Sequence, residues 1–141
     1  MSANDDVEQL SGSEREELLR VASAVAEKAY APYSNFRVGT AVVGEKGTYI
    51  GVNVENASHG LAICAERSAL AAAIAAGERK IRGIAIACVD APADSSAGFP
   101  CGACRQWMLE LAPGAEILIL GVAGSFCIED LLPRAFQPHQ S

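Results

Sequence analysis

The spacing of apolar residues changes along the first third of the chain, and each change marks an expected element. Apolar residues recur at helical spacing over residues 14–30, which predicts an amphipathic helix. We expect Ser13 and Glu16 to form a capping box at the start of this helix, and Pro32 to end it. The residues before the helix, 1–12, are polar and acidic, and we expect a flexible tail there.

Two apolar, β-branched runs follow at residues 38–43 and 48–54. They flank a Glu45-Lys46-Gly47 turn and therefore predict a β-hairpin. The next element is expected at residues 64–76, where an alanine-rich stretch favours a helix. Gly77 is placed to end that helix.

The second half of the chain alternates between expected strands and helices. Residues 81–89 and 117–122 are short apolar runs typical of buried strands, and residues 101–111 predict a helix between them. A short edge strand is expected at residues 125–128 and a short last helix at residues 129–135. This order predicts the α/β class, as a three-layer α/β/α sandwich around a mixed five-stranded sheet.

Composition and charge narrow the functional classes. The 141 residues suffice for one domain with a hydrophobic core, which we place at residues 13–141. The net charge of −6, without a cluster of Lys or Arg, argues against a nucleic-acid partner and favours a small-molecule substrate. No apolar run approaches the ~20 residues that span a bilayer, so we expect no membrane association.

Cysteine content and the first residues predict the compartment. The chain has five cysteines, an odd number, and it begins MSANDDVEQL, without the basic and apolar regions of a secretory signal. Both features favour reduced thiols and metal binding over disulfides. We therefore expect a cytoplasmic protein.

The strongest chemical signal comes from two short motifs, Cys64-Ala65-Glu66 and Pro100-Cys101-Gly102-Ala103-Cys104. Cys64 and Cys101 fall at expected helix starts, where free N–H groups favour thiolates, and Cys104 lies one turn after Cys101. Three thiolate ligands leave one position of a tetrahedral zinc ion open, as in catalytic sites. Glu66 is then an acid/base beside that position, and one zinc ion per chain is expected.

Structural interpretations of the same residues remain open at this point. A Cys-x-x-Cys pair alone is also typical of a redox dithiol, and Glu66 alone suits the first turn of any helix. A purely structural zinc site would need a fourth ligand, such as Cys88, Cys127 or His59. We expect Cys88 and Cys127 to be core thiols and His59 to be a surface or interface residue.

Two arginines follow the expected ligands closely. Three thiolates leave a divalent zinc ion with a net negative charge around it, which would raise the pKa of a bound water. Arg67 and Arg105 are near enough in sequence to donate hydrogen bonds to the sulfurs and offset that charge. We expect Arg67 to matter more, because it is three residues after Cys64.

Four separated motifs resemble those of the small homotetrameric, zinc-dependent cytidine deaminases. They are Pro32-Tyr33-Ser34-Asn35-Phe36 with Val38-Gly39; Asn53-Val54-Glu55-Asn56-Ala57-Ser58 with Gly60-Leu61 and the first cysteine motif; the second cysteine motif with Arg105-Gln106; and Leu131-Leu132-Pro133 with Phe136. The resemblance spans residues 14–136. It implies hydrolysis of cytidine and 2′-deoxycytidine to uridine, 2′-deoxyuridine and ammonia, as in pyrimidine salvage, by a homotetramer whose subunits share active sites.

The resemblance also implies roles for single residues in substrate binding. Phe36 would lie against the pyrimidine or the sugar. Asn53 and Glu55 would bind the ribose 3′-hydroxyl and so exclude polynucleotides, whose internal 3′ oxygens are esterified. The backbone N–H of Ala65 would donate to the pyrimidine O2. Phe136 would reach into the pocket of a neighbouring subunit.

The implied chemistry depends on one carboxylate. Glu66 would accept a proton from the attacking water, pass it to N3 and then protonate the departing amino group. Two alternatives stay open: a deaminase of another cytosine nucleoside, such as a nucleoside antibiotic, and a non-catalytic, zinc-stabilised binding module.

Four positions depart from the family pattern. His59 stands in place of the usual tyrosine and Thr40 in place of a common alanine. Trp107 replaces an aliphatic residue, and Arg134 interrupts the apolar end of the chain. None belongs to the expected chemistry, but His59 and Arg134 bear on the wall of a pocket between subunits.

Overall fold

Four strands form one mixed sheet in the computed structural model, which describes residues 7–93 and 95–139. The strands are β1 (Val38–Val43), β2 (Thr48–Val52), β3 (Gly83–Cys88) and β4 (Glu116–Ile119), in the spatial order β2-β1-β3-β4. β1 pairs antiparallel with β2 and with β3, whereas β3 and β4 are parallel. The predicted hairpin is thus confirmed, with the sheet continuing from its first strand.

The prediction of a fifth strand at residues 125–128 is wrong. Phe126 makes an isolated antiparallel bridge to Ile117 of β4, with N–H···O hydrogen bonds of 2.8 and 2.9 Å. Gly124, with φ of +81°, comes just before the bridge, and Cys127 just after it is already the N-cap of the next helix. The segment between these two residues is too short for a strand ladder, so the described part of the sheet has four strands.

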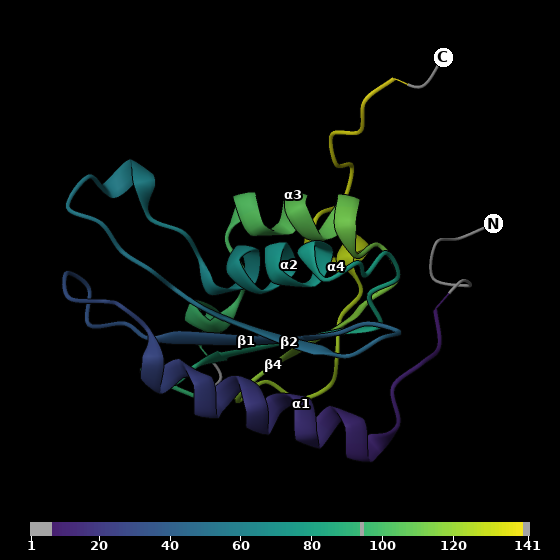
Figure 1. Ribbon diagram of the computed structural model, residues 1–141, viewed down its shortest axis with the longest axis horizontal. Helices are drawn as coiled ribbons and strands as arrows, with labels where there is room; N and C mark the ends of the chain where they lie inside the picture. The colour runs from purple at the N-terminus through teal and green to yellow at the C-terminus, as the bar shows by residue number, and fades with distance from the viewer. Residues whose placement is uncertain (1–6, 94, 140–141) are drawn as a thin grey trace.

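Helices cover both faces of the sheet (Figure 1). On one face lies α1 (Gly12–Val25), which continues as the 3₁₀ turn η2 (Ala26–Lys28). The other face carries α2 (Ala65–Ala75) and α3 (Gly102–Leu111), with the short α4 (Ile128–Leu131) against α3. Two further 3₁₀ turns, η3 (His59–Leu61) and η4 (Ser96–Gly98), lie in the loops before α2 and α3. The three predicted layers are therefore present.

The two faces of the sheet have separate hydrophobic cores. The larger core lies under α2 and α3 and includes Val42, Leu70, Ile84, Ile86 and Met108, all fully buried. The smaller core lies against α1 and includes Leu18, Ala22, Ala41, Ala85 and Leu118. Each large aliphatic side chain buried in this way contributes about 1.5–3 kcal/mol. Within the described residues, the helices are too short or too polar to cross a membrane.

Two glycines let helices lie directly on the sheet backbone. A Cβ at Gly39 of β1 would lie 2.1 Å from the carbonyl oxygen of Ala22 in α1. A Cβ at Gly51 of β2 would lie 2.3 Å from the backbone nitrogen of Ala69 in α2. Only glycine leaves room for these contacts. The contact at Gly51 fixes the first turns of α2, and thereby Glu66, against the sheet.

Helix α1 begins earlier than expected, because Ser11 and Glu14 form the capping box instead of Ser13 and Glu16. The Ser11 hydroxyl accepts a hydrogen bond from the N–H of Glu14 at 3.1 Å, and the Glu14 carboxylate accepts one from the N–H of Ser11 at 2.9 Å. Leu10 is buried in the smaller core and fixes the chain just before this cap. Residues 1–6 of the predicted tail lie outside the described residues.

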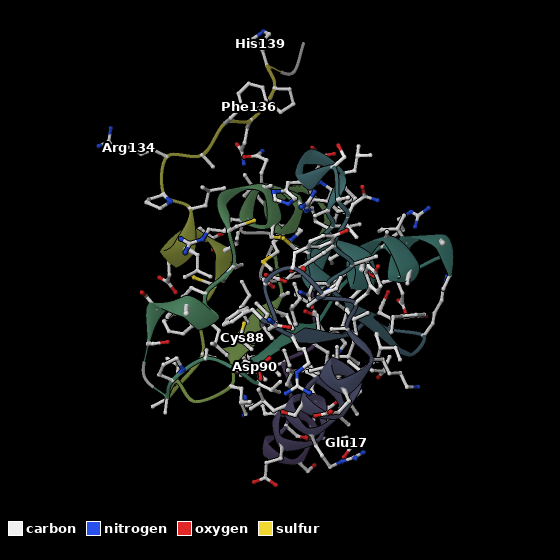
Figure 2. The ribbon with its side chains drawn as sticks, turned by 90° about the vertical axis from the view of Figure 1, so that its left-hand side faces the viewer. Glu17, Cys88, Asp90, Arg134, Phe136 and His139 are labelled. Atoms are coloured by element: carbon white, nitrogen blue, oxygen red, sulfur yellow. The ribbon has the colours of Figure 1, made fainter. Side chains whose placement is uncertain are left out.

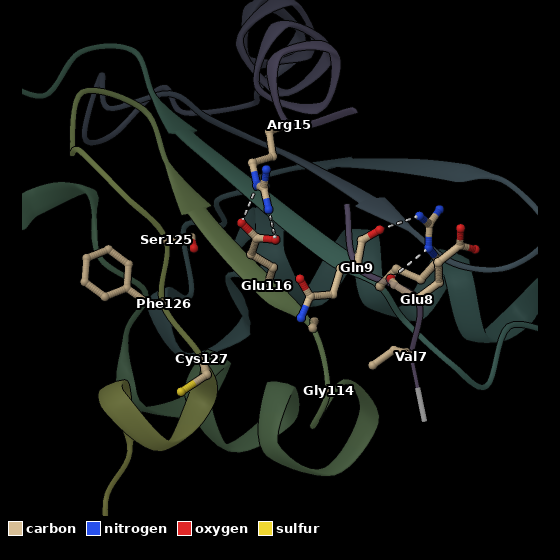
Figure 3. A pocket seen from close by; sticks show the side chains of 11 residues that line it. Val7, Glu8, Gln9, Arg15, Gly114, Glu116, Ser125, Phe126 and Cys127 are labelled. Carbon is tan, nitrogen blue, oxygen red and sulfur yellow. Dashed lines mark hydrogen bonds and ion pairs between the residues drawn. The ribbon is translucent and has the colours of Figure 1, made fainter. Parts of the chain in front are cut away.

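Two arginines fasten this N-terminal segment to the sheet (Figure 3). Arg15 forms a bidentate ion pair with Glu116 of β4, at 2.6 and 3.1 Å. Arg82 pairs with Glu14 at 2.9 Å and donates to the carbonyl oxygen of Glu8 at 3.1 Å. A cavity of about 280 Å³ lies between these groups. Arg15 and Arg82, which line this cavity, are already paired with carboxylates. Their contacts therefore stabilise the fold.

A buried carboxylate organises the β1–β2 turn. Glu78, only 1% exposed, accepts hydrogen bonds from the N–H groups of Glu45 (2.9 Å), Lys46 (2.8 Å) and Gly47 (3.0 Å) and from the hydroxyl of Tyr49 (2.8 Å). These bonds hold the turn against the end of α2. No local sequence pattern marks this residue, because its partners in the turn lie 31 to 33 positions earlier.

Candidate metal centre and active site

Two helix N-termini bring the three predicted cysteine ligands together. Cys64 is the N-cap of α2, Cys101 is the N-cap of α3, and Cys104 lies in the first turn of α3. The Sγ atoms of Cys64 and Cys101 are 3.8 Å apart, and those of Cys101 and Cys104 are 3.5 Å apart. All three sulfurs lie within 4.8 Å of one another.

This spacing fits a tetrahedral zinc ion, since Zn–S bonds of about 2.3 Å place two sulfurs about 3.8 Å apart. Three soft thiolates also suit zinc better than a hard cation. In the described part of the chain, the cluster contains no fourth ligand, and Cys88, Cys127 and His59 are not part of it. The cluster therefore fits one zinc ion per chain with one coordination position left for water or substrate.

Arg67 makes the predicted contact with a ligand sulfur. Its Nη2 donates to the Sγ of Cys64 at 3.5 Å. Hydrogen bonds from Cys104 and then from Arg67 lower the pKa of Cys64 to about 5. Its hydrogen-bond partner Cys104 shifts the other way, because that bond and burial both raise the pKa of the Cys104 thiol. One thiolate is thus stabilised by the protein itself.

Arg105 does not make the expected contact with a sulfur. Its Nε donates to the carbonyl oxygen of Pro100 at 2.8 Å, and its Nη1 donates to the carbonyl oxygen of Leu131, the last residue of α4. Successive residues point about 100° apart around a helix. The side chain of Arg105, the residue after Cys104, therefore points away from the cluster and toward α4.

Glu66 is the buried carboxylate beside the cluster. It is 5% exposed and lies on the face of α2 that packs on the sheet, together with Leu70 and Ala73. Burial is the main reason that the pKa of Glu66 is raised, to about 7, and the charge of Cys64 acts in the same direction. A bound divalent cation would act in the opposite direction. A buried carboxyl group beside the cluster is placed to accept and return a proton.

Asn53 fixes the backbone on both sides of Arg37, where β1 begins. Its Oδ1 accepts a hydrogen bond from the N–H of Val38 at 2.8 Å, and its Nδ2 donates to the carbonyl oxygen of Phe36 at 2.8 Å. An asparagine amide has two N–H groups and two lone pairs, so one of each remains for a ligand. Phe36 itself is half-buried.

Glu55 holds the loop that precedes Phe36. Its Oε1 accepts hydrogen bonds from the N–H groups of Tyr33 (3.0 Å) and Ser34 (3.1 Å), and its Oε2 accepts one from the Ser34 hydroxyl. The hydrogen bond from the Ser34 side chain is the largest cause of a lowered pKa at Glu55. The ring of Tyr33 meets His59 edge-on at 5.9 Å. These side chains line an open cavity of about 290 Å³.

The remaining predicted residues differ in exposure. Ala65 is fully buried in the first turn of α2, next to Cys64. Phe136 is 73% exposed, on a C-terminal segment that projects from the domain with Arg134 and His139 (Figure 2). Gln106 of α3 donates to the carbonyl oxygen of Phe136 at 3.1 Å, which holds the base of this segment.

Known proteins match this chain over most of its length. The family model described as "Cytidine and deoxycytidylate deaminase zinc-binding region" matches residues 12–120. A cytidine deaminase of Halalkalibacterium halodurans is 43% identical over 129 residues, which cover 87% of this chain and 94% of that protein. A cytidine deaminase of Mycobacterium tuberculosis is 42% identical over 116 residues, with 82% and 84% covered.

Solved structures of cytidine deaminases are also similar to this chain. The crystal structure of cytidine deaminase from Burkholderia pseudomallei is 44% identical, with a TM-score of 0.77 over 90% of this chain and 100% of that chain. The enzyme from Mycobacterium tuberculosis is 35% identical, with a TM-score of 0.74 over 87% and 97%. The segment matched by the family model includes Glu66 and all three clustered cysteines. By fold, by metal-binding residues and by sequence, this chain belongs to the cytidine and deoxycytidylate deaminase family.

Proposed function

We propose that this protein is a zinc-dependent cytidine deaminase that hydrolyses cytidine and 2′-deoxycytidine to uridine and 2′-deoxyuridine, with release of ammonia. The observation that carries the proposal is the three-cysteine cluster with the buried Glu66 beside it. A structural zinc site has four protein ligands and needs no acid/base. The cytidine deaminases at 42–43% identity support the same reaction.

Glu66 performs the proton transfers of this reaction. The zinc ion supplies activation of a water molecule for attack at C4 of the base. The Glu66 carboxylate accepts a proton from this water and delivers it to N3. It then transfers the second proton, from the hydroxyl group formed at C4, to the exocyclic amino group, which leaves as ammonia. Arg67, bonded to the Cys64 sulfur, offsets the negative charge of three thiolates.

Substrate binding is assigned to four residues, of which Glu55 lines the loop cavity. Asn53 and Glu55 bind the ribose 3′-hydroxyl, Phe36 packs against the nucleoside, and the N–H of Ala65 donates to O2 of the base. The ordered carboxylate of Glu55 and the free N–H of Asn53 support this assignment. A ligand without a free 3′-hydroxyl would leave the remaining N–H of Asn53 without a partner and would lose its bond to Glu55, which weakens binding. The site therefore favours nucleosides over polynucleotides.

Assembly and location belong to the same proposal. Phe136, exposed on its projecting segment, enters the pocket of a neighbouring subunit in a homotetramer. A site built from three reduced thiols suits the reducing cytoplasm, where the enzyme serves pyrimidine salvage. A different cytosine nucleoside is the second candidate substrate, because His59 replaces the family's tyrosine at the cavity.

The test is turnover of cytidine by the purified protein, with zinc measured on the same sample. We expect uridine formation with about one zinc ion per chain. Glu66→Ala should keep zinc and bind nucleoside but lose turnover by about 10²–10⁴-fold. Glu16→Ala, an exposed carboxylate of α1, is the matched control. If Glu66→Ala kept more than about a tenth of the activity, the proton-transfer role would be wrong. Zinc without turnover would direct the search to modified cytosine nucleosides.

A further inference from the structure

The peptide that leads into the Cys101 ligand is held by an arginine four residues later. Pro100 is buried and has no N–H, so its carbonyl is its only backbone hydrogen-bonding group. The Nε of Arg105 donates to this oxygen at 2.8 Å. A hydrogen bond from a guanidinium is charge-assisted and stronger than a neutral one.

The same guanidinium is braced against another element. Its Nη1 donates to the carbonyl oxygen of Leu131, and the side chain of Leu131 is buried in the larger core. Arg105 thus joins the residue before the metal ligand to the end of α4. A link fixed at both ends limits how far Pro100 and Cys101 can move.

Cys101 is the ligand that most needs such support. It is the exposed member of the cluster, whereas Cys104 is buried. Its sulfur makes contacts with the other two sulfurs, so its side chain does not cap α3. Cys64, in contrast, also receives a hydrogen bond from Arg67.

We infer that Arg105 is a positioning residue for the zinc ligand Cys101, acting through the carbonyl of Pro100 and braced by Leu131. Arg67 offsets the charge of the Cys64 sulfur, whereas Arg105 fixes the position of the Cys101 sulfur. Loss of an outer partner that orients a ligand typically lowers metal affinity by about 10–100-fold. The inference rests on the zinc binding in the proposed function and not on the identity of the nucleoside.

The experiment measures zinc release from the purified holoenzyme into excess 4-(2-pyridylazo)resorcinol, at a temperature well below the melting point of every variant. Arg105→Gln should release zinc at least about tenfold faster than the wild type. Arg105→Lys should be intermediate, because one ammonium cannot hold both carbonyls in the same geometry. Arg79→Gln is the matched control, since Arg79 also donates to two carbonyls, those of Ile74 and Glu78, at the far end of α2.

Two results would overturn the inference: wild-type release from Arg105→Gln, or equal acceleration in Arg79→Gln, which would indicate general loosening. If Arg105→Gln does not fold, zinc release from Arg105→Lys is the deciding measurement. Release from Arg105→Lys at the wild-type rate would then overturn the inference. The readout does not depend on cytidine turnover. A zinc-loaded wild type that leaves cytidine unchanged would contradict the proposed function and still permit this test.

Discussion

Glu78 concentrates four hydrogen bonds on one buried carboxylate, so Glu78→Gln should destabilise the fold. Its Oε2 accepts from the N–H groups of Lys46 and Gly47 and from the hydroxyl of Tyr49, while Oε1 accepts from the N–H of Glu45. A glutamine oxygen in the place of Oε2 keeps three of these bonds, but without the negative charge. Its NH₂ group then faces the Glu45 N–H, and two donors oppose each other.

The size of the effect follows from these four bonds. Hydrogen bonds to a charged group contribute about 1.5–3 kcal/mol and neutral ones about 0.5–1.5 kcal/mol. Three bonds are weakened and one is lost, but Glu45 and Lys46 are exposed, so water replaces part of the loss. We expect a net decrease of about 3 kcal/mol in the free energy of unfolding. For 141 residues, this corresponds to a decrease of about 10 °C in Tm.

The assay is urea unfolding of wild type, Glu78→Gln and Glu45→Gln, an exposed charge in the same turn. Burial raises the pKa of Glu78, but the hydrogen bonds from Tyr49 and the turn amides lower it more, to a value below the ordinary 4.5. A lowered pKa in the folded state stabilises the fold above pH 4.5, and this contribution is lost as the pH falls through the folded value. The difference between wild type and Glu78→Gln should be full at pH 7 and smaller at about pH 3.5.

Two results would refute this reasoning. One is a loss below about 1 kcal/mol at pH 7, which would mean that water replaces the carboxylate fully. The other is an equal loss at both pH values. All variants lose zinc in acid, so this effect cancels when their free energies of unfolding are compared. Glu45→Gln should stay within about 0.5 kcal/mol of wild type at each pH.

Three further outcomes are expected. Gly51→Ala should cost about 3 kcal/mol or more and reduce bound zinc, since its Cβ would lie 2.3 Å from the Ala69 nitrogen; an unchanged melting curve would contradict that contact. Asp90→Asn should cost little stability, because the ion pair with Arg37 is partly exposed. Since Arg37 lowers the pKa of Asp90 to about 2, unfolding measurements at pH 5 and 8 should show equal losses, and unequal ones would argue against this ion pair. Phe136→Ala should raise KM for cytidine and leave zinc content unchanged; an unchanged KM would exclude Phe136 from the pocket.

The local signals in the sequence predicted the metal cluster well. Cys64 and Cys101 each stand immediately before a strong helical stretch, and both became N-caps. Cys104 follows by one turn, so the geometry of two ligands depends on a single helix. Burial of Glu66 follows from its place on the apolar face of α2. These features could be predicted because they depend on residues a few positions apart.

The wrong or missing predictions concern contacts between distant segments. Arg105 turns to Leu131, 26 residues away, and Glu78 binds a turn 31 to 33 residues earlier. The apolar composition of residues 125–128 suits a strand, but pairing there is limited to the bridge at Phe126. Such contacts depend on how the layers are placed, which local sequence patterns do not determine.

The two glycine contacts have a consequence for how a nucleoside enters and leaves. At Gly39 and Gly51, helix backbones touch the sheet from opposite sides, without intervening side chains that could reorganise. Displacing α2 would therefore break backbone packing, whereas the loops at residues 30–37 and 55–63 are held to each other by the bond from the Glu55 N–H to the Tyr30 carbonyl and by the Glu55 carboxylate, which binds the N–H groups of Tyr33 and Ser34. Openings on the microsecond-to-millisecond timescale should be confined to these loops. Amide hydrogen exchange should accordingly be fast there and slow along α2, so that substrate exchange proceeds around a metal centre that does not move.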